Sequence, residues 1–214
     1  MVTLSAKKLS RGEVHRLLGL EPRLNGAFGS LLALEPLAQD ERLALTQIQQ
    51  EFLNYWEESK ISEGQVRFIS VAPLLRLAGF NELPIRLQVE EDIDRIYVED
   101  EDTYLTGRFD VIAVRRDGDG VMPLWILVVE SKNSEASESA GVAQMLTYAY
   151  SSFERQQAVW GLVTNGATYQ FFYVQKGTPS TYLFMPSLDL FGDDRAMQLL
   201  QVLNALRTWQ PEGE

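Results

Sequence analysis

The chain has 214 residues, 45% of them hydrophobic and 23% charged, which is the composition of an ordinary globular protein. It contains no Cys, which excludes disulfides, thiol nucleophiles and Cys-based zinc sites and leads us to expect a cytoplasmic protein. The only histidine is His15, so a His-rich zinc site and a Ser-His-Asp hydrolase are both disfavoured, and we expect a structural or surface role for it.

The formal net charge is −11. Nucleic-acid binding usually leaves a basic footprint, so this charge argues against tight non-specific DNA binding by the chain alone. No apolar run approaches the ~20 residues that span a bilayer, and no apolar segment follows the two lysines of the N-terminal MVTLSAKKLS. We therefore expect neither a membrane span nor a signal peptide.

Residues 1–60 are predicted to form a helical extension that packs on the core, and residues 61–214 to form the main domain of a single globular unit. Between residues 40 and 59, apolar side chains recur at roughly helical spacing and are expected to make core or interface contacts. They are Leu43, Leu45, Ile48, Phe52, Leu53 and Trp56.

The next segment begins with a capping box, with Ser62 as N-cap and Gln65 at the third helical position. Pro73 should kink or restart the helix, and Gly79 should end it. A short strand is expected at residues 85–89. Residues 90–102 carry eight acidic side chains and are expected to form a solvated loop, part of which rims the site.

Residues 107–132 read GRFDVIAVRRDGDGVMPLWILVVESK and predict a β-hairpin. Residues 111–115 have the period-two pattern of a strand, and residues 124–129 are wholly apolar, as in a strand buried on both faces. The intervening residues 116–120 contain two Gly and two Asp, which favour a turn.

A hairpin places the start of its first strand beside the end of its second. Asp110 would therefore lie near Glu130 and Lys132, which share one face of their strand while Ser131 points away. A divalent cation between the carboxylates would relieve their repulsion, and Mg²⁺ favours oxygen ligands. Lys132 would be free to activate a water or stabilise an oxyanion, so the cluster suits metal-assisted phosphodiester hydrolysis. Neutralisation by Asp110→Asn is expected to stabilise the metal-free protein.

Beyond Lys132, a polar loop at residues 133–141 leads into a helix ending near residue 156. Gln144 and Tyr148 are four residues apart on one face of this helix. Strands are expected at 158–163, 169–174 and 181–185, and a helix at 193–209. The fold class is thus α/β (α+β mixed): an α-β-β-β-α-β mixed sheet flanked by helices, with an N-terminal helical extension and an added C-terminal hairpin and helix.

Asp110 followed by Glu130-Ser131-Lys132 resembles the signature of the PD-(D/E)XK nuclease superfamily, which has the restriction-endonuclease-like fold, although Phe109 stands where the strict signature has proline. The residues QMLTY at 144–148 resemble the QxxxY pattern of RecB-like members. The segments EGQVRFISVAPLLRLAGF at 63–80 and GLVTNGATY at 161–169 resemble the N-terminal nuclease region of type I restriction enzyme R subunits.

This resemblance implies a restriction-enzyme-like DNA endonuclease that uses Mg²⁺, for which Mn²⁺ should substitute. Asp110 and Glu130 would be metal ligands and Glu63 a third, either directly or through a water, while Lys132 would position or activate the attacking water. Gln144 and Tyr148 would contact the substrate backbone or steady the lysine. The implied partners are DNA, a second copy of the chain for duplex cleavage, and a subunit that supplies DNA affinity or translocation.

Two other interpretations remain open from the sequence. The chain could be a non-catalytic nucleic-acid- or protein-binding regulatory protein on the nuclease fold. It could also be a metal-dependent hydrolase of RNA or nucleotides. For Glu63, a structural role is available as well, because a carboxylate in the first helical turn complements the helix dipole.

Overall fold

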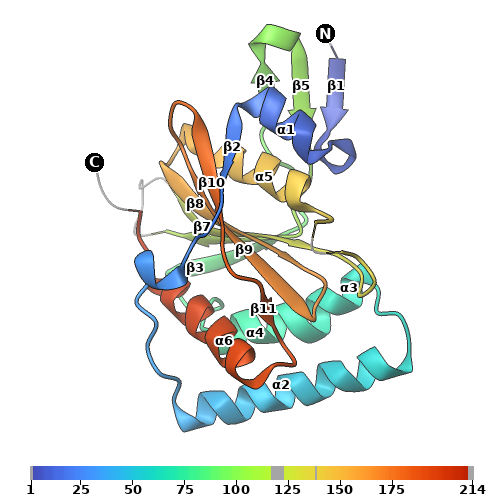
Figure 1. Cartoon of the computed structure of the whole chain (residues 1–214), viewed down its shortest axis with the longest axis vertical. Helices are drawn as coiled ribbons and strands as arrows, with labels where there is room; N and C mark the ends of the chain where they lie inside the picture. The colour runs from blue at the N-terminus through green and yellow to red at the C-terminus, as the bar shows by residue number, and fades with distance from the viewer. Residues whose placement is uncertain (1, 117–122, 138, 212–214) are drawn as a thin grey trace.

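The computed structural model describes residues 2–116, 123–137 and 139–211. An eight-stranded mixed sheet with the order β2-β10-β9-β8-β7-β6-β3, to which β11 is added beside β9, forms its middle layer (Figure 1). The strands are β2 (Leu20–Arg23), β3 (Ile85–Val89), β6 (Val111–Arg115), β7 (Leu124–Ser131), β8 (Ala158–Thr164), β9 (Thr168–Gln175), β10 (Ser180–Phe184) and β11 (Leu188–Asp189).

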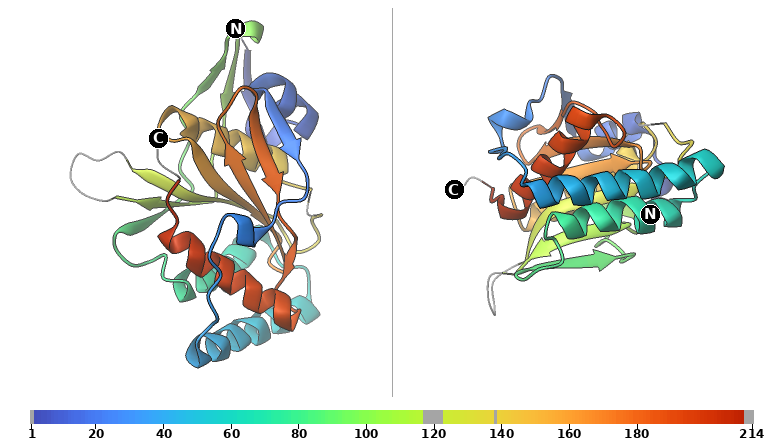
Figure 2. Two further views of the ribbon diagram at one scale, coloured as in Figure 1. Left: turned by 60° about the vertical axis from the view of Figure 1, so that its left-hand side comes forward. Right: turned by 90° about the horizontal axis from the view of Figure 1, so that it is seen from below.

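Helices cover both faces of this sheet. On one face lie α2 (Gln39–Glu58), α4 (Ala72–Leu77) and α6 (Asp193–Thr208), and on the other lie α1 (Arg11–Leu18) and α5 (Val142–Ser151). Figure 2 shows α2 running beside α4 on the outside of the first layer. Of the helices in the described part of the chain, none is both long and apolar enough to cross a bilayer.

The central elements follow the predicted order of helix, three strands, helix and strand. The helical segment that starts with α3 (Glu63–Val66) and ends with α4 is followed by β3, β6, β7, α5 and β8. Strands β3, β6 and β7 are antiparallel, whereas β7 and β8 are parallel. The predicted fold class, a mixed sheet flanked by helices, is therefore confirmed.

The hairpin that was predicted around the candidate site is present. β6 and β7 pair in antiparallel fashion, with Val111 opposite Val129 and a bulge at Ala113/Val114. All residues of β7 after Leu124 are buried, as its apolar sequence indicates. Of the predicted turn, residues 117–120 lie outside the described residues.

The segment before β3 also forms as expected. Ser62 caps α3, since its hydroxyl accepts a hydrogen bond from the Gln65 N–H. A π-helical turn (Arg67–Val71) follows, and α4 then restarts with Pro73 in its first turn. Gly79 ends the segment with φ +79°, a left-handed conformation that suits glycine.

Residues 1–60 are not purely helical, which corrects the sequence expectation. They contain α1 and α2, but also β1 (Val2–Ser5) and β2. β2 pairs in parallel with β10, and β1 pairs in parallel with β5 (Thr103–Thr106). Within α2, Phe52 is fully buried as expected, whereas Leu43 is 66% exposed.

The prediction of a solvated loop at residues 90–102 was only partly correct, because this stretch also contains a strand. They include β4 (Ile96–Val98), which pairs with β5, and the order β1-β5-β4 forms a second, three-stranded sheet. This small sheet stands apart from the main sheet, next to α1 (Figures 1 and 2). The helix predicted up to residue 156 ends at Ser151, where a 3₁₀ turn (Ser152–Glu154) continues it.

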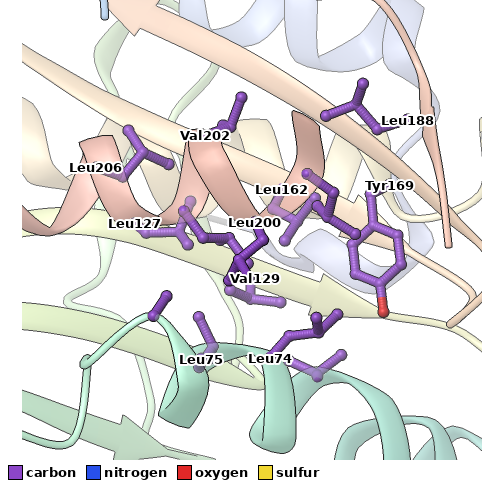
Figure 3. Packing of buried hydrophobic residues seen from close by; sticks show 14 of the residues in the cluster. Leu74, Leu75, Leu127, Val129, Leu162, Tyr169, Leu188, Leu200, Val202 and Leu206 are labelled. Atoms are coloured by element: carbon purple, nitrogen blue, oxygen red, sulfur yellow. The ribbon is translucent and has the colours of Figure 1, made fainter. Parts of the chain in front are cut away.

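Two hydrophobic clusters fill the space on the two sides of the main sheet. Figure 3 shows part of the first cluster, where Leu74 and Leu75 of α4 and Leu200 and Leu206 of α6 converge on the side chains of β7 and β8. The sheet is thereby held from both sides, and the ends of β6 and β7 are fixed relative to α3 and α5.

Candidate metal centre and its groove

Three carboxylates meet where β6 begins and β7 ends. Asp110 directly precedes β6, Glu130 is near the end of β7, and Glu63 is the first residue of α3. One carboxylate oxygen of each residue lies within 4.8 Å of those of the other two. The structure thus brings together all three acidic residues singled out in the sequence.

Glu130 is the most buried member of this group, with a fully inaccessible side chain. Its Oε1 accepts a hydrogen bond from Lys132 Nζ at 2.5 Å, whereas its Oε2 has no partner among the described residues. Burial, reinforced by the charge of Asp110 and opposed by that of Lys132, raises the pKa of Glu130 to about 8. An unpaired buried carboxylate oxygen beside two further acids is what a bound cation would satisfy.

Asp110 is held from two sides. Its Oδ2 accepts hydrogen bonds from the Ser131 backbone N–H at 2.7 Å and from the Ser131 hydroxyl at 2.6 Å. Its Oδ1 lies 3.3 Å from Arg67 Nη1, which also donates to Glu90 at 2.9 Å. Asp110→Asn would weaken these charge-assisted contacts. The stabilisation expected on neutralisation is therefore transferred from Asp110 to Glu130, whose buried Oε2 has no partner among the described residues.

Lys132 is oriented by a chain of polar contacts from α5. Its backbone N–H donates to Thr164 O at 2.8 Å, and its Nζ donates to Gln144 Oε1 at 3.2 Å. Gln144 Nε2 donates in turn to the Tyr148 hydroxyl at 2.7 Å, as their spacing on one helical face predicted. The Tyr148 hydroxyl also accepts a bond from the backbone N–H of Arg108, so α5 connects the lysine to the segment before Asp110.

Two of the three carboxylates, Glu63 and Asp110, line a groove of about 590 Å³ together with Gln144 and Tyr148, whereas the fully buried Glu130 is not in its lining. Four basic and four acidic side chains line it, in contrast to the acidic excess of the whole chain: Lys7, Arg67, Arg95 and Arg108 against Glu63, Glu90, Asp92 and Asp110. The groove is therefore balanced in charge before any cation binds, and a cation would make it positive.

Sequence reasoning did not identify these four basic residues. It was also wrong about Ser131, which was expected to point away from the cluster but donates to Asp110 through its hydroxyl. The four basic residues lie in four separate segments, and no local motif links them. One signal was available for Arg67, which is four residues after Glu63 and so on the same face of a helix. His15, by contrast, bonds the Tyr182 hydroxyl through Nε2 at 2.8 Å, in keeping with the structural role expected for it.

The chemistry available at this centre follows from its donors. Three carboxylates in an all-oxygen cluster could hold a hard divalent cation. The Lys132 ammonium, whose side chain is 14% exposed, is a fixed positive charge and proton donor beside them. Carboxylate–cation chemistry next to a lysine is suited to hydrolysis of phosphate esters.

Gly141 is a structural requirement of this centre that the sequence did not reveal. It precedes α5 with φ +87°, and a Cβ on it would lie 2.8 Å from Lys132 Cε and 3.0 Å from Glu130 Cγ. Gly141→Ala is expected to lower the free energy of unfolding by about 1–3 kcal/mol, because of backbone strain and displaced site side chains. Urea unfolding measures this loss.

The control is Gly12→Ala, because Gly12 lies in α1 and a Cβ added to it would have no atom within 4 Å. That variant should be unchanged or about 0.5–1 kcal/mol more stable, as expected for alanine in a helix. Equal effects of the two substitutions would contradict the close packing of Gly141 against Lys132 and Glu130.

Comparisons with known proteins give little further information. No protein-family model matches the chain, and no curated protein matches it. Among solved structures, it is similar to one described as a fragment of an HsdR subunit of a type I restriction enzyme from Vibrio vulnificus YJ016. The identity is 18% and the TM-score 0.40, over 67% of this chain and 26% of that chain. The chain thus spans about a quarter of the length of that structure.

Proposed function

We propose that this protein is a metal-dependent endonuclease that hydrolyses DNA phosphodiester bonds. The observation that carries the proposal is the group of Glu63, Asp110 and Glu130, whose carboxylate oxygens lie within 4.8 Å of one another beside Lys132. The sequence pattern of Asp110 followed by Glu130-Ser131-Lys132, with its resemblance to the PD-(D/E)XK signature, points the same way.

In this proposal Asp110 and Glu130 hold Mg²⁺, with Glu63 as a third ligand and Mn²⁺ as an accepted substitute. When bound, the metal would supply Lewis-acid stabilisation of charge on the phosphate oxygens. Ser131 and Arg67 fix the two oxygens of Asp110, so that this carboxylate does not need to reorient.

Lys132 has the remaining chemical role. Its ammonium holds the attacking water and stabilises the charge that develops on the phosphate. Gln144 keeps the Nζ in place through its Oε1, and Tyr148 in turn orients Gln144. These two residues are therefore positioning groups for the lysine in our proposal.

The basic side chains of the groove favour a polyanionic substrate over a small neutral one. Arg95 and Arg108 line the groove with largely exposed side chains and could contact phosphates on either side of the cleaved bond. The alternative, a non-catalytic binding protein, leaves Lys132 unexplained, because simple binding does not require a half-buried lysine between a carboxylate and a glutamine.

The experiment that tests this function is a cleavage assay on supercoiled plasmid and on single-stranded DNA with Mg²⁺, Mn²⁺ or EDTA. We expect cutting with either metal and none with EDTA. Parallel incubations with RNA and with nucleotides separate a deoxyribonuclease from other phosphate hydrolases. Intact DNA in every condition, with purified and folded protein, would contradict the proposal.

A further inference from the structure

The small sheet β1-β5-β4 has one covered face and one open face. Leu4, Ile96 and Leu105 pack into the second hydrophobic cluster. Because side chains alternate along a strand, the residues next to these three in their strands point to the opposite face of the sheet. These are Thr3, Ser5, Tyr97, Tyr104 and Thr106.

This open face continues into the groove of the metal centre. Ser5 and Thr106, which are paired partners on β1 and β5, both line the groove. Only Gly107, Arg108 and Phe109 separate Thr106 from Asp110. In Figure 1, β5 runs from the tip of the small sheet toward the main sheet, so the chain leads from this sheet to Asp110 at the start of β6.

Two tyrosines stand on the open face, farther from the carboxylates than Thr106 along the chain. Tyr97 and Tyr104 are direct cross-strand partners, with ring centroids 4.9 Å apart and an interplanar angle of 36°. Tyr97 is 45% exposed, and its hydroxyl donates to Asp102 Oδ1 at 3.2 Å, which fixes the direction of the ring. Tyr104 is half-buried beside it. An exposed aromatic ring held in this way can stack with a nucleobase.

Basic side chains accompany the tyrosines toward the site. Arg95 is two residues before Tyr97 and lines the groove, as do Lys7 after β1 and Arg108 after β5. Arg108 keeps a 62% exposed side chain although it lies 3.7 Å from Glu90. The acidic residues 99–101 lie at the tip of the small sheet that is farthest from the carboxylates. They would repel phosphates, so a bound polyanion would not extend beyond them.

We propose that the open face of the small sheet binds a single DNA strand and leads it to the metal centre. Tyr97 and Tyr104 stack with unpaired bases, and Lys7, Arg95 and Arg108 contact the phosphates between them and the carboxylates. A duplex is excluded from these tyrosine contacts because its bases expose only their edges. The inference rests on the proposed nuclease function and names its substrate as single-stranded or frayed DNA.

The test is fluorescence anisotropy with labelled oligothymidylate and a duplex of the same length, at neutral pH with EDTA so that no cutting occurs. We expect tighter binding of the single strand, and a loss of about tenfold or more for Tyr97→Ala and for Tyr104→Ala. Tyr97→Phe should lose much less affinity than Tyr97→Ala, because the ring is retained although its bond to Asp102 is lost.

The matched control is Tyr55→Ala, because Tyr55 is also 45% exposed but lies on α2, outside the groove lining. It should bind as the wild type does. Arg95→Gln provides a second test that leaves the aromatic pair intact. It should reduce the slope of log affinity against log salt by about 0.7, the value for one phosphate contact on a single strand.

Unchanged affinity of both tyrosine variants, equal losses for Tyr97→Ala and Tyr97→Phe, or tighter binding of the duplex would each overturn the inference. If an alanine variant melts at a much lower temperature than the wild type, the salt dependence of DNA binding by Arg95→Gln decides instead. If duplex DNA is cut equally well with and without the tyrosines, the proposed strand-binding role of the open face is refuted but the proposed nuclease function is not. A protein that binds the strand through the tyrosines but cuts nothing would refute the nuclease alone.

Discussion

Replacing Lys132 with alanine is expected to lower the rate of DNA cleavage by about 10²- to 10⁴-fold, the usual effect of removing a general acid–base group. In the structure Lys132 Nζ is bonded to Glu130 Oε1 and Gln144 Oε1, beside the carboxylate cluster. Steady-state cleavage of a labelled oligonucleotide measures the change. It should appear in kcat, because Lys132 is not a main contact for the DNA backbone in this account.

Lys60→Ala is the matched control, because Lys60 also pairs with a glutamate, Glu135, but its side chain is 54% exposed and lies outside the groove lining. That variant should cut at the wild-type rate. The Lys132→Ala protein should still show a rise in melting temperature with Mn²⁺, because the three carboxylates are intact. Wild-type cleavage by Lys132→Ala would contradict the catalytic role of the lysine.

Replacing Glu130 with glutamine is expected to stabilise the metal-free protein at alkaline pH. The pKa of Glu130 is raised to about 8 by burial and by Asp110, whereas an unfolded glutamate titrates near 4.5. Between these two values the folded state holds a proton that the unfolded state has released, so rising pH favours unfolding. From pH 5 to pH 8 the loss attributable to Glu130 is about 3–4 kcal/mol.

Urea unfolding at these two pH values, in EDTA, measures the effect. The wild type should lose stability across this range, and Glu130→Gln should lose about 3–4 kcal/mol less. Glu135→Gln, which removes a carboxylate whose side chain is 65% exposed, should behave as the wild type does. Parallel pH profiles for wild type and Glu130→Gln would show that Glu130 is not the buried, repelled acid described above.

Local patterns in the sequence were sufficient for the elements that build the candidate site. The apolar run of β7 and the alternation of β6 predicted the hairpin, and the hairpin by itself requires Asp110 and Glu130 to be neighbours. The capping box at Ser62 likewise fixed the start of α3, and so the position of Glu63. These features depend on periodicity and capping, which can be read from adjacent residues.

What could not be predicted depends on contacts between distant segments. β1 and β5 are about 100 residues apart and four residues long each, which is too short for a periodic signal. The three-stranded sheet that they form with β4 includes part of the acidic stretch 90–102, which the sequence had suggested to be a loop. The same reason explains Arg67 and Ser131, because a hydrogen bond to Asp110 is decided by how α3 and the hairpin pack together.

The most direct test of the central claim is titration of the protein with Mn²⁺, followed by electron paramagnetic resonance of the free ion. The proposed centre predicts saturable binding by the wild type that Glu130→Gln and Asp110→Asn each abolish, whereas Glu135→Gln leaves it intact. Mg²⁺ should compete for the same site. Absence of saturable binding to the wild type, or unchanged binding to both site variants, would contradict a metal centre formed by Glu63, Asp110 and Glu130.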